Sequence, residues 1–277
     1  MVNTPFSTII SVYANDRFDW FREAINSIEN QTTPPHQIII VKDGPIEGKI
    51  NDYITDINKS KNGIDFSLYE TKTNLGRGNT LNPALKMSKY DYVSIMDADD
   101  IARIDRFEMQ LNFFNNNPDI DVLGGWIEEF ENRPKDIGKI RKVYSDHYEI
   151  MKSSRNYCPM NNVTVMFKKA AVLSVGGYEG GIGVQEDYIL WIKMLTKGFK
   201  FANIDKVLVD VRVGNGLQSR RGGVNYVIEE IKMQQLFYDL KHISFTKMIF
   251  SITMRSIVRL MPQSIRRYIY LLIRIIR

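Results

Sequence analysis

The sequence Tyr92-Val-Ser-Ile-Met-Asp97-Ala-Asp99-Asp100 joins an apolar, β-branched run to three carboxylates within four residues. Residues 92–96 are predicted to form a buried strand, and the carboxylates follow at its carboxyl end. Because side chains alternate along an extended chain, Asp97 and Asp99 point the same way. Two adjacent carboxylates repel each other unless a cation lies between them, and Mg²⁺ and Mn²⁺ prefer such ligands and share them with phosphates. The stretch predicts a divalent-metal site for a phosphorylated ligand. The alternative is an acidic loop that caps the next helix.

Apolar runs and amphipathic segments alternate along the first part of the chain. The runs that predict strands are 6–12, 36–41, 66–70 and 92–96. The segments with helical spacing between them are 18–28, 46–59 and 79–87. Such alternation predicts an α/β fold whose mostly parallel sheet has helices on both faces. Ligands bind at the carboxyl ends of such strands, so we expect Asp43, after the second strand, to lie near Asp97 and Asp99.

The rest of the chain is less regular. Strands are predicted at 121–127, 163–167 and 201–213, and helices at 104–114, 168–175 and 187–195. Residues 128–154 are charged and poorly periodic, which predicts a loop-rich excursion, whereas 226–277 have a helical pattern. The predicted organisation is one domain at 1–213, with halves at 1–105 and 106–213, and a helical extension at 214–277.

The composition is that of an ordinary globular protein. Of the 277 residues, 44% are hydrophobic and 25% are charged. Cys158 is the one cysteine, so no internal disulfide and no cysteine-based zinc cluster is expected. The first residues lack a signal-peptide pattern, and no stretch reaches the roughly 20 apolar residues that span a bilayer.

The basic residues are concentrated near the end of the chain. From Arg212 onward there are 12 Lys and Arg against 3 Asp and Glu, although the net charge of the whole chain is only +5. Residues 249–259 and 264–277, on either side of Pro262, mix Ile, Leu, Tyr and Phe with six arginines, and the apolar residues that share one helical face in the second stretch are Ile265, Ile269, Leu272 and Ile276. This pattern predicts an interfacial helix on an anionic membrane. The alternative is a helix that packs on its own domain or on a homodimer partner. No nucleic-acid-binding pattern is present, so no nucleic acid is expected.

Two motifs follow the first two predicted strands. Residues 11–16, Ser-Val-Tyr-Ala-Asn-Asp, lead directly into a helix, where backbone amides suit phosphates and side chains such as Tyr13 and Asp16 suit a nucleoside. Residues 43–45, Asp-Gly-Pro, place a carboxylate where a base N–H or a ribose hydroxyl would reach it. Each motif also fits a plain turn.

Two further motifs open helices. Residues 74–79, Asn-Leu-Gly-Arg-Gly-Asn, combine glycines that allow close backbone approach with Arg77, which suits a phosphate. A flexible surface loop is the alternative. Glu186 and Asp187 begin a helix, where the helix dipole alone favours acids. Their functional interpretation is a general base that deprotonates an attacking hydroxyl.

Together these motifs carry a resemblance that each alone does not. Ser-Val-Tyr, Asp-Gly-Pro, Asn-Leu-Gly-Arg-Gly-Asn, Asp-Ala-Asp-Asp, Gly-Gly-Tyr at 176–178 and Glu-Asp-Tyr-x-Leu-Trp at 186–191 follow one another in this order. Over roughly residues 6–213 the sequence resembles the family 2 glycosyltransferases of the GT-A fold. It is most similar to bacterial enzymes that build O-antigen, capsule and exopolysaccharide.

The resemblance implies roles for individual residues. Asp97 lies nearer the ribose of a UDP-sugar and Asp99 binds Mn²⁺ or Mg²⁺, with both counted as metal-site residues. Asp187 is the inverting catalytic base, with Glu186 as second choice. The remaining nucleotide-sugar-binding residues are Tyr13, Asp16, Asp43, Asn74, Gly76 and Arg77. The residues assigned to the acceptor are Asn161, Asn162, Tyr178 and Trp191. Similar sequences often have a histidine near Asn162, and this chain departs from that pattern in the segment assigned to the acceptor.

The implied function is transfer of a hexose, glucose or galactose, from a UDP-sugar to an N-acetylhexosaminyl-diphosphate-polyprenyl lipid. Residues 1–105 would bind the nucleotide sugar and 106–213 the acceptor, with the protein peripheral on the cytoplasmic face of the plasma membrane. A sugar nucleotidyltransferase is an alternative, but residues 11–16 lack its glycine-rich loop. The second alternative is a non-catalytic module that binds sugar nucleotides or membranes.

Overall fold

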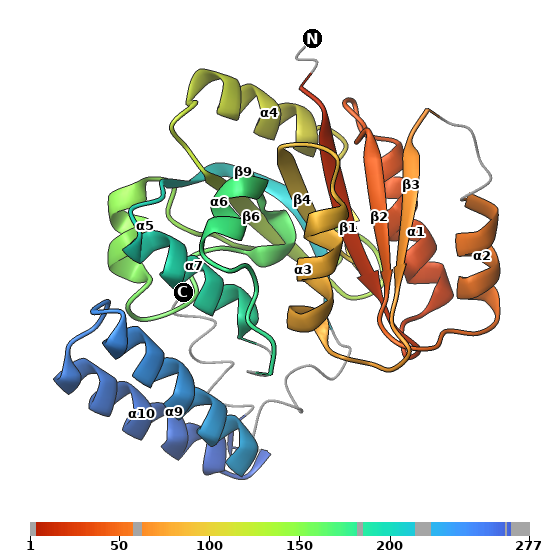
Figure 1. Cartoon of the computed structure of the whole chain (residues 1–277). Helices are drawn as coiled ribbons and strands as arrows, with labels where there is room; N and C mark the ends of the chain where they lie inside the picture. The colour runs from red at the N-terminus through yellow and green to blue at the C-terminus, as the bar shows by residue number, and fades with distance from the viewer. Residues whose placement is uncertain (1–3, 58–62, 182–184, 214–222, 264, 267–277) are drawn as a thin grey trace.

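The computed structural model describes residues 4–57, 63–181, 185–213, 223–263, 265 and 266. Within these residues, one nine-stranded sheet has the order β3-β2-β1-β4-β8-β6-β9-β5, with β7 paired to β6. Helices cover both faces of the sheet, and a hairpin of α9 (Val224–Asp239) and α10 (Phe245–Leu260) lies beside α5 and α7 (Figure 1). The predicted α/β class with a largely parallel sheet is confirmed.

Four parallel strands make up the first half of the sheet. They are β1 (Phe6–Val12), β2 (Gln37–Lys42), β3 (Asp65–Glu70) and β4 (Tyr92–Asp97). In this register Ser11 is the neighbour of Val41 on one side and of Asp97 on the other. The carboxyl ends of the strands therefore meet at one edge, as their order in the sequence predicts.

The helices between these strands follow the predicted spacing. They are α1 (Phe18–Glu29), α2 (Lys49–Ile57) and α3 (Arg77–Met87). Helix α1 buries Phe21, Ala24, Ile25 and Ile28, which lie three or four residues apart on one face. Along β1, Ile9 contributes to the core on one face of the sheet and Ile10 to the core on the other.

The second half mixes strand directions. Its strands are β5 (Ile101–Ala102), β6 (Val122–Phe130), β7 (Lys139–Arg141), β8 (Met166–Lys168) and β9 (Phe201–Arg212). Strand β8 runs antiparallel to β4 and β6, whereas β9 runs parallel to β6. Its helices are α4 (Arg106–Asn116), α5 (His147–Ser153), α6 (Lys169–Ser174) and α7 (Glu186–Thr196).

The sequence was misleading at three places in this half. The predicted strand at 163–167 is wrong at its start, because Asn162–Thr164 form a 3₁₀ turn (η1) that the Thr164 hydroxyl stabilises by donating to the carbonyl of Asn161 at 2.7 Å. The predicted excursion at 128–154 contains the end of β6, β7 and α5. The two-residue strand β5 is too short for any periodic signal.

The α9–α10 hairpin packs on the domain rather than standing apart from it. The Tyr188 ring of α7 meets the Phe237 ring of α9 edge-on at a centroid distance of 4.9 Å, and both residues belong to the core on that face. No helix among the described residues is both long and apolar enough to cross a bilayer. Of the predicted interfacial stretch, residues 249–259 lie in α10, and within 264–277 all but 265 and 266 fall outside the described residues.

Candidate active site

Acidic side chains gather where β1 and β4 end. The carboxylate of Asp16 accepts a hydrogen bond from the backbone N–H of Tyr13 at 2.9 Å, which fixes the turn after β1. Burial raises the pKa of Asp16 to about 7, and the nearby charges of Asp99 and Asp97 raise it further against that hydrogen bond. The structure thus brings the predicted residues 13, 16, 97 and 99 to one place and concentrates negative charge there.

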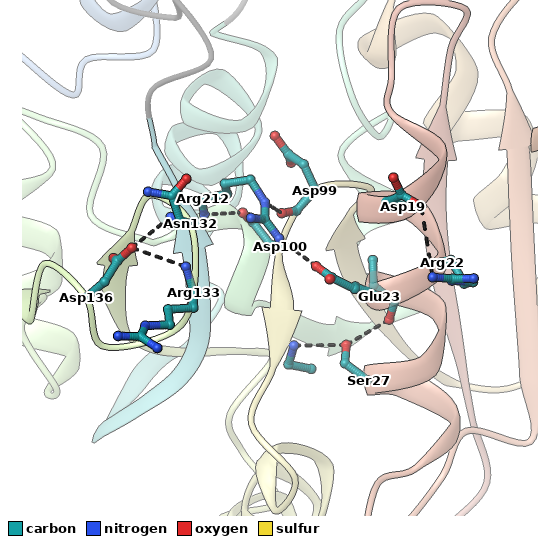
Figure 2. A network of polar contacts seen from close by, with 12 residues as sticks. Asp19, Arg22, Glu23, Ser27, Asp99, Asp100, Asn132, Arg133, Asp136 and Arg212 are labelled. Carbon is teal, nitrogen blue, oxygen red and sulfur yellow. Dashed lines mark hydrogen bonds and ion pairs between the residues drawn. The ribbon is translucent and has the colours of Figure 1, made fainter.

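Arg212, at the end of β9, holds the loop that follows β4 (Figure 2). Its backbone N–H donates to Asp100 Oδ1 at 2.8 Å, and its Nε donates to the carbonyl of Asp99 at 3.1 Å. Its Nη2 donates to Glu23 Oε2 on α1 at 2.7 Å. The guanidinium also lies over the rings of Trp20 and Phe130, 4.8 and 4.5 Å from their centroids.

Arg212 is a functional residue that the sequence analysis missed. Its side chain is only 4% exposed, lies against two aromatic rings and donates to two acceptor groups. It is more than a hundred residues from Asp99 in the chain, so no local motif includes both. The third carboxylate, Asp100, is buried, and burial together with the charges of Asp99 and Asp97 raises its pKa well above the usual range. Asp100 therefore anchors the loop instead of facing a ligand.

Arg77, at the start of α3, lies beside the acids. Its Nη2 is 2.5 Å from Asp97 Oδ1. Burial alone would lower the pKa of Arg77, but the charges of Asp97 and Glu186 together raise it. Arg77, the predicted phosphate-binding residue, thus forms an ion pair with Asp97 at the end of β4. The charge of Glu186 at the start of α7 also acts on it.

Asp43 holds the loop that contains Asn74 and Gly76. Its two carboxylate oxygens accept hydrogen bonds from the backbone N–H groups of Leu75 at 2.7 Å and Gly76 at 2.9 Å. Gly44 has a φ of +92°, and a Cβ there would lie 2.8 Å from the backbone nitrogen of Asn74, so only glycine fits this turn. Asp43 is buried and positions the loop. Its Oδ1 also accepts from the Thr71 hydroxyl at 3.4 Å, so Oδ2 is the oxygen with a lone pair left for a nucleoside.

Residues 178–186 of the second half pack against α3. The Asn82 side chain donates to the carbonyl of Tyr178 at 2.7 Å and accepts from its N–H at 2.8 Å. A Cβ on Gly78 would lie 2.7 Å from the carbonyl of Glu179 and 3.3 Å from the Cβ of Glu186. These contacts explain why glycine occupies position 78 and why the start of α7 faces the nucleotide-binding motifs.

Two carboxylates lie at the start of α7. Asp187 Oδ1 accepts from the N–H of Tyr188 at 2.7 Å, and its Oδ2 is 4.0 Å from the sulfur of Cys158. Burial raises the pKa of Asp187. Glu186 is 8% exposed, and its Oε2 has no hydrogen-bond partner in the described residues. Burial, and to a smaller extent the charge of Asp187, raises the pKa of Glu186 to about 6. A carboxylate pair with raised pKa values suits general-base chemistry.

The four predicted acceptor residues lie at different depths. Trp191 is 0% exposed among core aromatic rings, and Asn161 is 1% exposed and donates to the carbonyl of Gly125 at 2.8 Å. The assignment of these two to direct acceptor contact is corrected, because both side chains are buried in the protein. Tyr178 and Asn162 each have a side-chain oxygen without a hydrogen-bond partner in the described residues.

Comparison with known proteins agrees with this geometry. The profile described as Glycosyl transferase family 2 matches residues 7–178. A UDP-Gal:alpha-D-GlcNAc-diphosphoundecaprenol beta-1,3-galactosyltransferase from Escherichia coli is 41% identical, over 97% of this chain and 96% of its own. The amylovoran biosynthesis glycosyltransferase AmsE from Erwinia amylovora is 29% identical, over 96% of this chain and 97% of its own.

Solved structures show the same fold at low identity. The Staphylococcus aureus TarS fragment 1–349 with UDP-GlcNAc has a TM-score of 0.65 and 16% identity, covering 92% of this chain and 72% of its own. The mannosyltransferase PcManGT of Pyrobaculum calidifontis, with GDP-Man and Mn²⁺, has a TM-score of 0.63 and 14% identity, covering 91% and 68%. The fold is that of the GT-A enzymes, and the chain belongs to glycosyltransferase family 2.

Proposed function

We propose that this protein transfers galactose from UDP-galactose, with inversion, to the N-acetylhexosamine of a polyprenyl diphosphate in the assembly of a bacterial surface polysaccharide. The observation that carries the proposal is the convergence of two acidic groups. The group at the end of β4 faces the Glu186–Asp187 pair, with Arg77 between them. The E. coli relative, similar over nearly its whole length, supports the choice of donor and acceptor over glucose transfer.

The residues after β4 fit a divalent cation. Asp97 and Asp99 have hard oxygen atoms of the kind these ions prefer. Burial raises the pKa of Asp16, and the charges of Asp99 and Asp97 raise it further, a repulsion that a cation would relieve. Among the described residues no three His, Cys, Asp or Glu side chains form a metal-binding group. Mn²⁺ or Mg²⁺ would therefore take further ligands from the donor diphosphate and water. When bound, the ion neutralises the charge of the leaving diphosphate.

Asp187 is the proposed base. It would take the proton from the acceptor hydroxyl as that oxygen forms a bond with the anomeric carbon, and the bond from that carbon to UDP breaks with its electron pair leaving on the phosphate oxygen. Attack opposite the leaving group inverts the carbon, so an α-linked donor gives a β-linked product. Glu186, beside it, is the second candidate, and its charge acts on Arg77.

An acceptor held by a lipid requires the protein to work at a membrane. We infer a peripheral position on the cytoplasmic face of the plasma membrane, with the basic residues of the C-terminal extension attracted to anionic lipid. Homodimer packing of the same extension stays the alternative. A membrane-bound substrate and a basic extension are what support this position.

Thermal shift and transfer assays test the proposal. We expect UDP-galactose with Mn²⁺ to raise the melting temperature, because ligand stabilisation scales with occupancy, and to support transfer better than UDP-glucose. Asp187→Asn should keep the thermal shift and lose transfer. Unchanged transfer by Asp187→Asn, or no shift with any uridine nucleotide, would refute the proposal. Release of pyrophosphate from UTP and a sugar phosphate would instead indicate a nucleotidyltransferase.

A further inference from the structure

A basic pocket lies between the end of α5 and the turn that joins α9 to α10. Its volume is about 900 Å³, and it is open to solvent. The charged and amide residues that line it are Lys152, Arg155, Asn156, Asp239, Lys241 and Lys247. Four cations against one acid make this pocket suited to an anion.

Two of the cations are available to a ligand. Neither Arg155 nor Lys241 forms an ion pair within the described part of the chain, and both are exposed. The acid, Asp239, accepts a hydrogen bond from the Gln235 side chain at 2.9 Å. An arginine with a free planar fork and a lysine point charge are the usual donors to phosphate oxygens.

The chain that forms one wall of the pocket leads directly to the proposed base. The Tyr188 hydroxyl donates to the carbonyl of Ser154 at 2.6 Å, and the sulfur of Cys158 is 4.0 Å from Asp187 Oδ2. Asn156 lines the pocket and is two residues before Cys158, a separation of at most about 7 Å along the chain. The wall of the pocket is thus joined to the base through two residues of chain and the contact between Cys158 and Asp187.

Helix α10 fixes this wall. The Nζ of Lys247 donates to Asn156 Oδ1 at 2.6 Å, and Arg255 donates to the carbonyl of Asn156. Glu230, buried on α9, pairs with Arg255 at 2.8 Å and so holds that arginine in place. The segment is therefore kept in position by contacts from the hairpin.

Large apolar side chains are exposed along α10 beginning at the pocket. Phe245 follows the pocket residue Ser244, and the further exposed apolar residues on this helix are Ile249, Phe250, Met254, Ile257 and Leu260. An isolated exposed apolar residue is ordinary, but a row of them on one helix marks an interaction surface. An anion pocket next to such a row matches an amphiphile with a charged group between a sugar and a hydrocarbon chain.

We propose that this pocket binds the diphosphate of the lipid-linked acceptor, with Arg155 and Lys241 as its main ligands and the lipid chain along α10. The proposal rests on the proposed function, because it assumes an acceptor of that class. The pocket holds the acceptor so that its sugar hydroxyl reaches Asp187. It also explains why a hairpin outside the sheet is packed against α7.

The test compares two synthetic acceptors that carry the same short alkyl chain. One is the N-acetylglucosaminyl diphosphate, and the other is the N-acetylglucosamine glycoside without phosphates. In Arg155→Gln/Lys241→Gln we expect the KM for the diphosphate to rise at least tenfold, while the KM values for the glycoside and UDP-galactose stay unchanged. Lys232→Gln, which removes an exposed α9 cation that does not line the pocket, is the matched control.

Three results would overturn the proposal. An equal loss with both acceptors would show that the substitutions act on the fold. An unchanged KM for the diphosphate acceptor, with weaker binding to phosphatidylglycerol vesicles, would show that the pocket binds membrane headgroups. Failure of the unmodified enzyme to use either acceptor, while UDP-galactose still stabilises it, would refute the proposed acceptor class and this assignment with it.

Discussion

The two halves of the sheet build the site in different ways. In the first half, the parallel strands β1, β2 and β4 each end at or next to a residue of the candidate site, and these positions follow from register. In the second half, strand directions are mixed, and its contribution comes through contacts between distant residues, such as Arg212 with Asp99. The comparison indicates that local order positions the proposed donor-binding residues of the first half, whereas distant contacts of the second half position the proposed base and hold the loop after β4.

The two substitutions with the largest expected effects on transfer, one in each half of the sheet, should differ in their effect on UDP binding. Asp99→Asn removes the proposed metal ligand of the first half, which should lower transfer by about 10³-fold, the equivalent of several kcal/mol, and abolish the Mn²⁺-dependent thermal shift with UDP. Asp187→Asn in the second half should lower transfer by about 10²- to 10⁴-fold and keep that shift. Single-turnover rates and melting curves measure both. Loss of UDP binding in both variants would contradict the division of labour.

Arg212 tests how strongly the second half supports the first. Arg212→Gln should raise the Mn²⁺ concentration for half-maximal activity by about 10- to 100-fold, because groups that orient metal ligands have effects of this size. Arg103→Gln is the matched control: Arg103 pairs with Glu128 at 2.5 Å and Asp210 at 2.6 Å at the same end of the sheet, with no hydrogen bond to Asp99 in the described residues. An equal change in Mn²⁺ dependence for both variants would indicate only a general loss of stability.

Asn82 joins the halves through the backbone of Tyr178. Asn82→Ala leaves the N–H and the carbonyl of Tyr178 without their partner, which should reduce the free energy of unfolding by about 2–3 kcal/mol. Urea denaturation measures the change. Asn30→Ala, at the exposed end of α1, removes a hydrogen bond within a single helix and should change stability by less than about 0.5 kcal/mol. Equal effects would mean that the contact between halves adds nothing.

His242 extends the comparison to the hairpin that packs on the second half. Its Nε2 lies 2.9 Å from the Ser154 hydroxyl, and burial, then the charge of Arg155, lowers its pKa to about 4. The unfolded chain therefore binds a proton that the folded chain does not, and stability falls as the pH drops from about 6.5 to 4. The contribution of His242 to this loss of unfolding free energy should be on the order of 2 kcal/mol.

The measurement for His242 is the difference between two pH profiles. His242→Gln keeps a polar group of similar size near Ser154 but does not titrate in this range. The unfolding free energy of the variant should lose less between pH 6.5 and 4 than that of the unmodified protein. Parallel profiles would show that His242 titrates normally in the folded chain.

Sequence reasoning was accurate where the signals are periodic. The predicted first strand matches β1 at both ends, and the predicted helix at 18–28 matches α1 to within one residue. It was less accurate after residue 127, where short antiparallel strands and the 3₁₀ turn at 162–164 lack a period. The acceptor residues show the same limit, because Trp191 and Asn161 belong to motifs near the site but have buried side chains.

The sequence by itself determined that acids follow the strands and that the strands alternate with helices, because side-chain period and chain direction are local properties. Only the tertiary structure decided which groups pair. It set Arg77 against Asp97, Arg212 against the Asp99 loop, and α5 against the α9–α10 turn to form a basic pocket. These contacts join residues 20 to more than 100 positions apart, and a side chain carries no local signal for so distant a partner.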